Sequence, residues 1–270
     1  MVIEKKKGHK IVLTIEARMA STRLPGKVLK PLAGEPLLKQ LISRVRQAKR
    51  VDAIILATTT RKNDDALVSL AKYLGIDYFR GSEEDVLSRL AGAVNQSEAD
   101  VVVGLTGDNP LVDPGLIDDM IDFYYKGNYD YVSNTYMQHS NLWDAERTFP
   151  LGVGVQVCKA SALLEIDKEV TEIGIREHAT FAIYHRNDKR YKLGAFEAVG
   201  KYKEWNHPEL RLTVDTPEDY KLISKIFDDL YPEDQLFPTL DAIRLIVNDT
   251  SLKSINSRVE QKIVYKETPA

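Results

Sequence analysis

The sequence has few cysteines, no long apolar run and no excess of positive charge, and each shortage excludes a class of protein. The 270 residues include one cysteine, Cys158, which excludes an intramolecular disulfide framework and a cysteine-based zinc site. No apolar run reaches membrane length and no signal peptide follows the charged start, so we expect a cytoplasmic protein without membrane contact. The 37 basic and 40 acidic residues give a net charge of −3, which argues against binding to nucleic acid.

Short apolar runs alternate with amphipathic stretches along the chain. The predicted strands are 11–15, 53–57, 101–105, 129–132, 153–157 and 210–214, and the predicted helices are 36–48, 65–74, 85–94 and 114–125. This alternation predicts an α/β fold, with a mostly parallel sheet covered by helices on both faces. We expect one domain over 1–250, a lid or acceptor segment at about 134–200, and a C-terminal tail over 251–270.

Polar stretches follow three of the predicted strands. They read EARMASTRLPGK (16–27), ATTTRKNDD (57–65) and TGDNPLVDP (106–114). In open α/β sheets, ligands bind at the carboxyl ends of the strands. The three stretches therefore predict one shared binding site.

The first stretch concentrates positive charge. Arg18, Arg23 and Lys27 lie within ten residues, and Gly26 permits close approach of the backbone. Such a loop suits an anion with several phosphate oxygens, because arginine offers a planar fork and lysine a mobile charge. The spacing matches neither a P-loop nor a dinucleotide-binding glycine motif, and a solvated basic surface is the alternative interpretation.

Several ordered motifs resemble one family. ARMASTRLPGK is similar to the A-R-x-x-S-x-R-L-P-x-K motif of the sugar cytidylyltransferases, which include the synthetases of CMP-activated keto-deoxy-octulosonate and of CMP-activated nonulosonic acids. The stretches PLAGEPLL, FRGSEEDVLSR, TGDNPLVDP, YVSNT, REHAT and LRLTVDTPEDY resemble the SpsF-like branch, which serves spore coat polysaccharide biosynthesis. Agreement of several motifs in order is more specific than any one of them.

The resemblance implies a Rossmann-like nucleotide-diphospho-sugar transferase fold and a role in surface polysaccharide synthesis. It implies that CTP is joined to an acidic sugar or a related acceptor and that pyrophosphate leaves. The residues expected to bind the nucleotide are Arg18, Ser21, Arg23, Gly26, Lys27, Thr58 and Thr59, and those expected to act in catalysis are Arg18, Lys27 and Asp108. The two threonines equally suit a plain strand end.

Two aspartates are the expected ligands of Mg²⁺. The resemblance assigns this role to Asp108 and Asp215, and a triphosphate brings a hard cation that prefers oxygen ligands. Asp215 has a second interpretation, because D-T-P-E-D also matches a helix N-cap followed by proline and acids. The acids Asp64 and Asp65 are most simply the start of a helix.

The acceptor side is the least defined part of the site. The candidate acceptor-binding residues are Asn134, Tyr136, Arg147, Glu177 and His178, although a lone histidine is more often a structural hydrogen-bonding group. Other classes stay open: a guanylyltransferase or another nucleotidyltransferase, a glycosyltransferase that uses a nucleotide sugar, and a nucleotide-binding module without turnover. We expect a homodimer from the resemblance.

Overall fold

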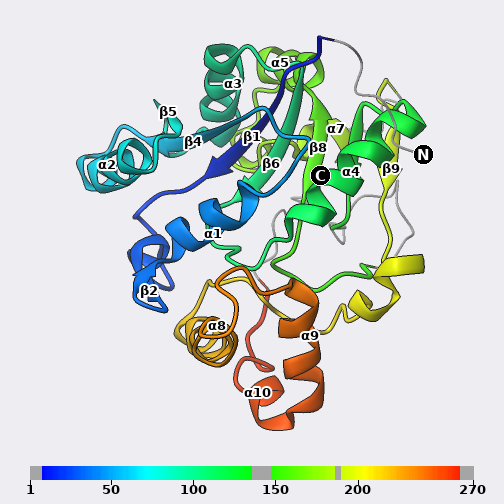
Figure 1. Cartoon of the computed structure of the whole chain (residues 1–270). Helices are drawn as coiled ribbons and strands as arrows, with labels where there is room; N and C mark the ends of the chain where they lie inside the picture. The colour runs from blue at the N-terminus through cyan, green and yellow to red at the C-terminus, as the bar shows by residue number, and fades with distance from the viewer. Residues whose placement is uncertain (1–7, 136–146, 186–189, 262–270) are drawn as a thin grey trace, which may run out of the picture.

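The computed structural model describes residues 8–135, 147–185 and 190–261. Its centre is a sheet of seven strands in the order β5-β4-β1-β6-β8-β7-β9 (Figure 1). β5, β4, β1 and β6 are parallel to one another, whereas β8 runs antiparallel to both of its neighbours. Within the described ranges, no helix is both long and apolar enough to cross a bilayer.

The sheet strands are short, and helices connect most of them. The strands are β1 Ile11–Glu16, β4 Ala53–Thr59, β5 Asp77–Gly81, β6 Val101–Thr106, β7 Tyr131–Ser133, β8 Gln156–Lys159 and β9 Leu193–Ala195, and a separate ribbon pairs β2 Pro31–Leu32 with β3 Glu35–Pro36. The α-helices are α1 Leu37–Val45, α2 Asp65–Leu74, α3 Val86–Ser97, α4 Pro114–Gly127, α5 Ala160–Glu169, α6 Ile173–Arg176, α7 Phe181–His185, α8 Pro217–Leu230, α9 Thr239–Asn248 and α10 Thr250–Ser254. Three 3-10 helices, η1 Lys27–Leu29, η2 Lys62–Asp64 and η3 Gly200–Trp205, complete the described elements.

Helices cover both faces of the sheet, as the apolar strands predict. Ile11, Leu13 and Ile15 of β1 pack into one core with α1 and α4. Val12, which points to the opposite face, packs in a second cluster with Ala93 of α3. Burial on both faces explains why these strands are continuous apolar runs rather than alternating ones.

The predicted helices are confirmed, with local reasons for their ends. α2 has the predicted bounds and ends at Gly75, whose φ of +64° is the left-handed conformation that glycine adopts easily. α4 begins after Asp113, whose carboxylate accepts a hydrogen bond from the Leu116 amide at 2.9 Å. Pro114 follows at the first helical position, where its missing N–H costs nothing.

The prediction of a strand at 210–214 is wrong. In the structure this segment makes only an isolated bridge between Arg211 and Leu151. It runs against Gly152, where an added Cβ would lie 2.2 Å from the Thr213 nitrogen. The segment is extended and apolar, but it crosses beside two short loop segments instead of joining a neighbouring strand.

The strand predicted at 153–157 is also displaced. β8 spans Gln156–Lys159, and the residues before it belong to the connection. Strand prediction from apolar composition locates a buried extended segment but does not show which of its residues find a hydrogen-bonded partner.

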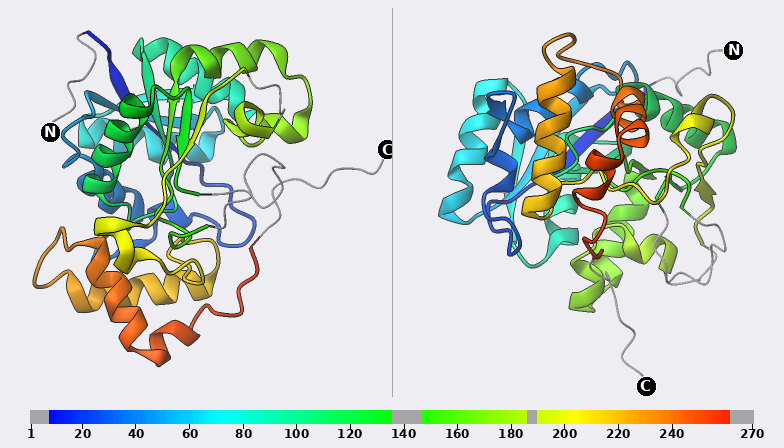
Figure 2. Two further views of the ribbon diagram at one scale, coloured as in Figure 1. Left: turned by 90° about the vertical axis from the view of Figure 1, so that its right-hand side faces the viewer. Right: turned by 90° about the horizontal axis from the view of Figure 1, so that it is seen from below.

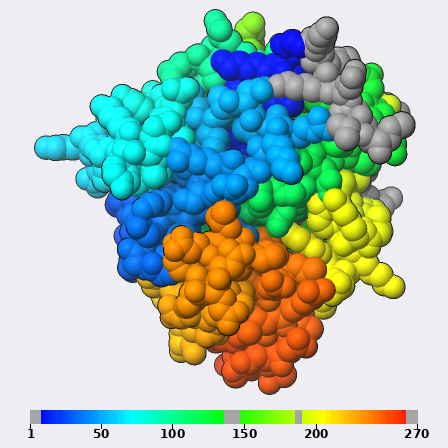
Figure 3. Space-filling view, in the orientation of Figure 1, coloured from blue at the N-terminus to red at the C-terminus, as the bar shows by residue number. Residues whose placement is uncertain are grey.

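The C-terminal helices form a layer at the carboxyl ends of the central strands. Figures 1 and 2 show α8, α9 and α10 on the side toward which β1 points, and Figure 3 shows this layer against the segment that follows β1. The Tyr220 hydroxyl of α8 donates to the Pro31 carbonyl at 2.6 Å. α10 spans the boundary expected between 250 and 251, and Leu252 is 5% exposed, so the first part of the predicted tail packs on the domain.

Candidate active site

A lysine and two aspartates meet at the carboxyl ends of β1 and β6. Nζ of Lys27 donates to Oδ2 of Asp108 at 2.7 Å and to Oδ1 of Asp215 at 2.7 Å. The three side chains are 12%, 20% and 14% exposed, respectively, so ligands can still reach them. The fold thus brings together two carboxylates separated by 107 positions (215 − 108). Asp108 follows β6, as the strand-end argument predicts, whereas Asp215 follows an extended segment that is not a strand of the sheet.

The position of Asp108 depends on a close contact between two strand ends. The Gly107 amide donates to the Glu16 carbonyl at 2.8 Å. A Cβ on Gly107 would lie 2.8 Å from the Ala17 Cβ, so only glycine fits without displacement. The Thr106 hydroxyl then donates to Oδ1 of Asp108 at 2.6 Å and fixes the rotation of that carboxylate.

Asp215 is not the N-cap of α8. Thr216 takes that position and forms a capping box with Asp219. The Asp215 carboxylate instead faces three cations: Lys27, Arg23 at 3.1 Å and Arg211 at 2.7 Å. The helix-start pattern is therefore present, but it begins one residue later than the aspartate of interest.

A buried ion pair supports Asp215 from behind. Nε of Arg211 donates to Oδ1 of Asp219 at 2.9 Å, and Asp219 is fully buried. Oδ2 of Asp219 also accepts from the Asp215 and Thr216 amides, both at 3.0 Å. Asn256 donates to Oδ1 of Asp219 at 2.9 Å, so a residue of the predicted tail contributes to this support.

The charges of the cluster stabilise one another. Burial raises the pKa of Asp215, but the Lys27 ammonium, followed by Arg23 and Arg211, outweighs burial and holds that pKa below its ordinary value. Burial likewise lowers the pKa of Lys27, and the carboxylates of Asp108 and Asp215 more than reverse this effect. The carboxylate is therefore ionised and the lysine protonated at neutral pH.

The loop after β1 is held by its own backbone and by Asp64. The Met19 carbonyl accepts from the Gly26 amide at 3.0 Å, and Gly26 has a φ of +69°. Oδ1 of Asp64, which is 2% exposed, accepts from the Met19 amide at 2.7 Å. Ser21 accepts from the Leu24 amide at 3.4 Å and closes the turn in between. The tight turn delivers Lys27 to the carboxylates.

Asp64 therefore does more than start a helix. It precedes α2 but makes no side-chain capping bond. Its Oδ2 instead accepts from the Thr59 amide at 3.2 Å and from the Thr59 hydroxyl. The prediction that Asp64 and Asp65 start a helix is confirmed, and in addition the Asp64 carboxylate joins the end of β4 to the loop after β1.

Thr58 and Thr59 lie at the end of β4 and are both fully buried. The Thr59 hydroxyl is bonded to Asp64, and the Thr58 hydroxyl has no hydrogen-bond partner among the described residues. The side chains of the two predicted nucleotide contacts are thus enclosed, and the first of them holds an unsatisfied buried hydroxyl.

Arg18 lies apart from the lysine–aspartate contact. Its guanidinium donates to the Glu83 carbonyl at 3.3 Å and lies 3.6 Å from the Glu83 carboxylate, and its side chain is 42% exposed. Glu83 follows β5 and also pairs with Arg61. Arg18 therefore contacts the residue that follows β5, whereas Arg23 and Lys27 both contact Asp215.

The predicted acceptor residues have different environments. Asn134 is fully buried: its amide donates to the Val153 carbonyl at 3.1 Å and accepts from the Val155 amide at 2.8 Å, so a ligand would reach it only by opening that contact. Glu177 is exposed, and the ring of His178 packs edge-on against Phe181. Tyr136 lies outside the described residues.

Arg147 is the acceptor candidate whose side chain carries a permanent positive charge. It is half-buried and donates to the Pro208 carbonyl, while its Nε has no partner among the described residues. Burial, followed by the positive charge of Arg211, lowers the pKa of Arg147. The Arg147 guanidinium is therefore within electrostatic range of Arg211, and its Nε is a buried donor.

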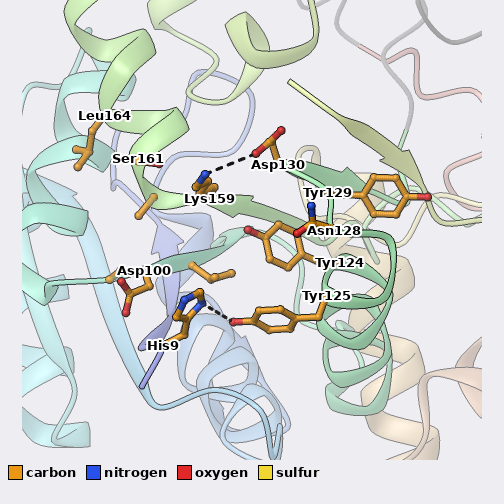
Figure 4. Close-up of a pocket in the computed structure, with 13 residues that line it drawn as sticks. His9, Asp100, Tyr124, Tyr125, Asn128, Tyr129, Asp130, Lys159, Ser161 and Leu164 are labelled. Atoms are coloured by element: carbon orange, nitrogen blue, oxygen red, sulfur yellow. Dashed lines mark hydrogen bonds and ion pairs between the residues drawn. The ribbon is translucent and has the colours of Figure 1, made fainter. Parts of the chain in front are cut away.

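A cavity with a different lining lies at the amino ends of β1 and β6 (Figure 4). It measures about 380 Å³ and is lined by His9, Asp100 and Tyr125, which precede or flank the amino ends of β1 and β6. The His9 ring lies 3.4 Å from the Tyr125 hydroxyl. This cavity lacks the cation cluster that a triphosphate requires.

Cys158 is buried, and burial raises its thiol pKa to about 12, consistent with a core residue.

Four residues of the site were missed by sequence reasoning: Asp64, Glu83, Arg211 and Asp219. Arg211 offered a signal, because a single charge inside the apolar run LRLTV requires a specific partner. Asp64 offered another, since a helix start needs only one of two adjacent acids. Glu83 and Asp219 carry no pattern that separates them from ordinary loop and helix-start acids.

Comparison with known proteins identifies the family of this chain. The model of the family described as Cytidylyltransferase matches residues 12–265. MJ1063, an uncharacterized protein of Methanocaldococcus jannaschii, is 37% identical over 262 residues, which cover 96% of this chain and 98% of that protein. The spore coat polysaccharide biosynthesis protein SpsF of Bacillus subtilis is 38% identical over 223 residues, covering 80% of this chain and 86% of SpsF.

A solved structure is also similar over most of its length. The cytidylyltransferase of Leptospira borgpetersenii superposes with a TM-score of 0.78 at 29% identity and covers 90% of this chain and 96% of its own. The fold and the sequence thus agree with the predicted resemblance. The chain belongs to the cytidylyltransferase family and is a nucleotidyltransferase enzyme.

Proposed function

We propose that this enzyme is a Mg²⁺-dependent cytidylyltransferase that joins CTP to an acidic sugar or a related acceptor for the synthesis of a surface polysaccharide. The observation that carries the proposal is the contact of Lys27 with both Asp108 and Asp215 at the strand ends. Membership in the cytidylyltransferase family supports the nucleotide, and similarity to SpsF supports the pathway.

The donor set fits a magnesium ion. Among the described residues, no three His, Cys, Asp or Glu side chains form a complete metal cage. Mg²⁺ differs from cage-bound metals in this respect, because it commonly binds through one or two carboxylates, substrate phosphates and water. Asp108 and Asp215 would hold the ion, with one oxygen of each already directed at a common cation. Bound there, the ion would neutralise charge on the triphosphate.

The protein's own cations position the nucleotide. Arg18 and Arg23 are about two-fifths exposed, Arg18 beside Glu83 and Arg23 beside Asp215, and both can bind phosphate oxygens. Lys27, fixed by the turn at Gly26, supplies a compact charge close to the reacting phosphates.

The reaction is a displacement at the α-phosphorus. An acceptor oxygen forms the new bond to that phosphorus, the bond to the bridging oxygen breaks, and pyrophosphate departs with the electron pair. Because the protein does little covalent chemistry in such transfers, positioning and charge neutralisation supply most of the rate enhancement.

Arg147 supports an acidic acceptor. Its Nε has no partner among the described residues, and arginine binds carboxylates through two parallel hydrogen bonds. Glu177 and His178 remain proposed contacts for the rest of the acceptor.

A panel of substrates tests the proposal. Each of CTP, GTP, ATP and UTP is combined with acidic and neutral sugar acceptors, and pyrophosphate release is measured with and without Mg²⁺. We expect release only with CTP, an acidic acceptor and the metal together. Release with GTP would favour a guanylyltransferase, and transfer from a nucleotide sugar without pyrophosphate would favour a glycosyltransferase.

A further inference from the structure

The free enzyme already contains a cation between its two aspartates. Nζ of Lys27 lies 2.7 Å from one oxygen of each carboxylate, and no other described side chain contacts both. We propose that Lys27 occupies the metal position in the free enzyme and moves to the phosphates when the metal–nucleotide complex enters. This inference rests on the proposed metal site and adds the order in which its ligands bind.

The remaining carboxylate oxygens are also engaged. Oδ1 of Asp108 accepts from the Thr106 hydroxyl at 2.6 Å, and Oδ2 of Asp215 accepts from Arg211 at 2.7 Å and lies 3.1 Å from Arg23. A free metal ion would therefore have to break two charge-assisted hydrogen bonds of Lys27 before it gained either ligand. The ammonium left behind would then stand beside a divalent cation, which repels it.

A nucleotide removes both obstacles. Its phosphates offer Lys27 a new set of acceptors, so the lysine leaves one anion for another without losing its ion pairing. The same phosphates supply further ligands to the metal. Metal and nucleotide should thus each strengthen the binding of the other, and this coupling must be equal in both directions.

Lys27 also offsets the repulsion between the carboxylates of Asp108 and Asp215. Two ionised carboxylates directed at one point would repel each other, and the lysine holds them in the geometry that the metal will need. The fold places this lysine on η1, directly after the Gly26 turn, so a small movement of a flexible four-carbon side chain is sufficient for the exchange.

Binding of Mn²⁺, followed by the electron paramagnetic resonance signal of the free ion, tests the exchange without turnover. Lys27→Met keeps a flexible unbranched side chain but removes the charge. Without nucleotide, we expect this variant to bind Mn²⁺ at least about tenfold more tightly than the wild type, within the usual range of coupling between ligands. Lys39→Met, which removes a lysine that pairs with Glu35 and lies over the Tyr73 ring, should leave binding unchanged.

Two further measurements separate the possible failures. Lys27→Met/Asp108→Asn should lose the gain in affinity, and Lys27→Gln serves if melting curves show that the methionine variant is unfolded. Equal Mn²⁺ affinity of the wild type and both folded Lys27 variants would overturn the exchange. If Mn²⁺ binding with CTP is the same in the wild type and in Asp108→Asn, the proposed metal site itself is wrong.

Discussion

The two halves of the sheet differ in how strongly the local sequence defines them. β5, β4, β1 and β6 form a parallel half with strands of five to seven residues, and each connection between them along the chain carries an α-helix. β8, β7 and β9 form a mixed half with strands of three or four residues. Periodicity predicted three of the four parallel strands and displaced or missed those of the mixed half.

This difference has a functional counterpart. The parallel half carries several of the motifs that resemble the family, among them ARMASTRLPGK and TGDNPLVDP, and its loops position Lys27 and Asp108, whereas YVSNT and REHAT lie on the mixed half. The mixed half carries the proposed acceptor residues, and Arg147 lies on the connection before β8. The proposed phosphate-binding residues thus lie on the locally encoded half, and the part expected to choose the acceptor lies on the half defined by long-range pairing.

The largest expected effect concerns the carboxylates of Asp108 and Asp215. Asp108→Asn and Asp215→Asn should each lower kcat by about two to three orders of magnitude, because charge neutralisation at the phosphates is lost. The two losses should be far from additive, since both residues serve one ion. Pyrophosphate release by each single variant and by the double variant provides the measurement.

Asp113→Asn is the matched control, since Asp113 caps α4 on the same loop. It should reduce the melting temperature slightly and spare kcat. A normal kcat in folded Asp215→Asn would show that this aspartate serves only to hold Lys27, Arg23 and Arg211 in place.

A second test addresses the mixed half alone. Arg147→Ala should raise the KM for an acidic acceptor by about tenfold or more, because a charge-assisted pair is lost, and should leave the KM for CTP near its original value. Steady-state kinetics with each substrate varied in turn measures the split. Arg190→Ala, on the same half but paired with Glu165 and Glu169 on the surface, is the control. Equal changes in both KM values would contradict a division of labour between the halves.

The third test addresses the parallel half alone. Asp64→Ala leaves the Met19 and Thr59 amides without their acceptor, at a cost of about 1–3 kcal/mol of stability. The loosened loop should raise the KM for CTP by about tenfold and leave the acceptor KM unaffected. Asp64→Asn, which keeps one acceptor oxygen, should recover part of the loss.

Asp65→Ala is the neighbouring control, because Asp65 pairs with Arg80 on the surface and does not touch the loop. An Asp64 variant that melts early yet retains the wild-type KM for CTP would limit Asp64 to a role in folding.

The smallest expected effect is a pH dependence at the end of β1. Burial, opposed by Arg89, raises the pKa of Glu16 to about 7 from 4.5. Between these values the folded state holds a proton that the unfolded state has released, so stability is present below pH 4.5 and declines as the pH rises toward 7.

Glu16→Gln should remove this decline, which amounts to about 1–3 kcal/mol, because glutamine stays neutral throughout. Urea unfolding of both proteins at several pH values gives the difference, and Glu35→Gln, at a partly exposed surface pair, should follow the wild type. Parallel pH profiles for the wild type and Glu16→Gln would show that Glu16 is ionised in the folded protein across this range.

Much of the site was predictable because several of its residues lie close together in the sequence. The loop 16–27 packs its cations into ten residues, and GDNP follows a strongly apolar strand. Such signals need no knowledge of distant contacts. The error at 210–214 and the additional role of Asp64 have the opposite origin: in both, a residue's role depends on a partner far along the chain, Leu151 in one and Met19 in the other.

The sequence by itself determined the α/β alternation, the helix ends at Asp113 and Gly75, and the concentration of charge after β1, because all of these arise from local periodicity, capping and turn chemistry. Only the tertiary structure decided that Lys27 stands between Asp108 and Asp215, that Arg211 and Asp219 support them, and that Asn134 is enclosed. These contacts join segments up to 188 positions apart. Local physical chemistry fixes how each segment folds, but the distance between two segments depends on the packing of the whole core.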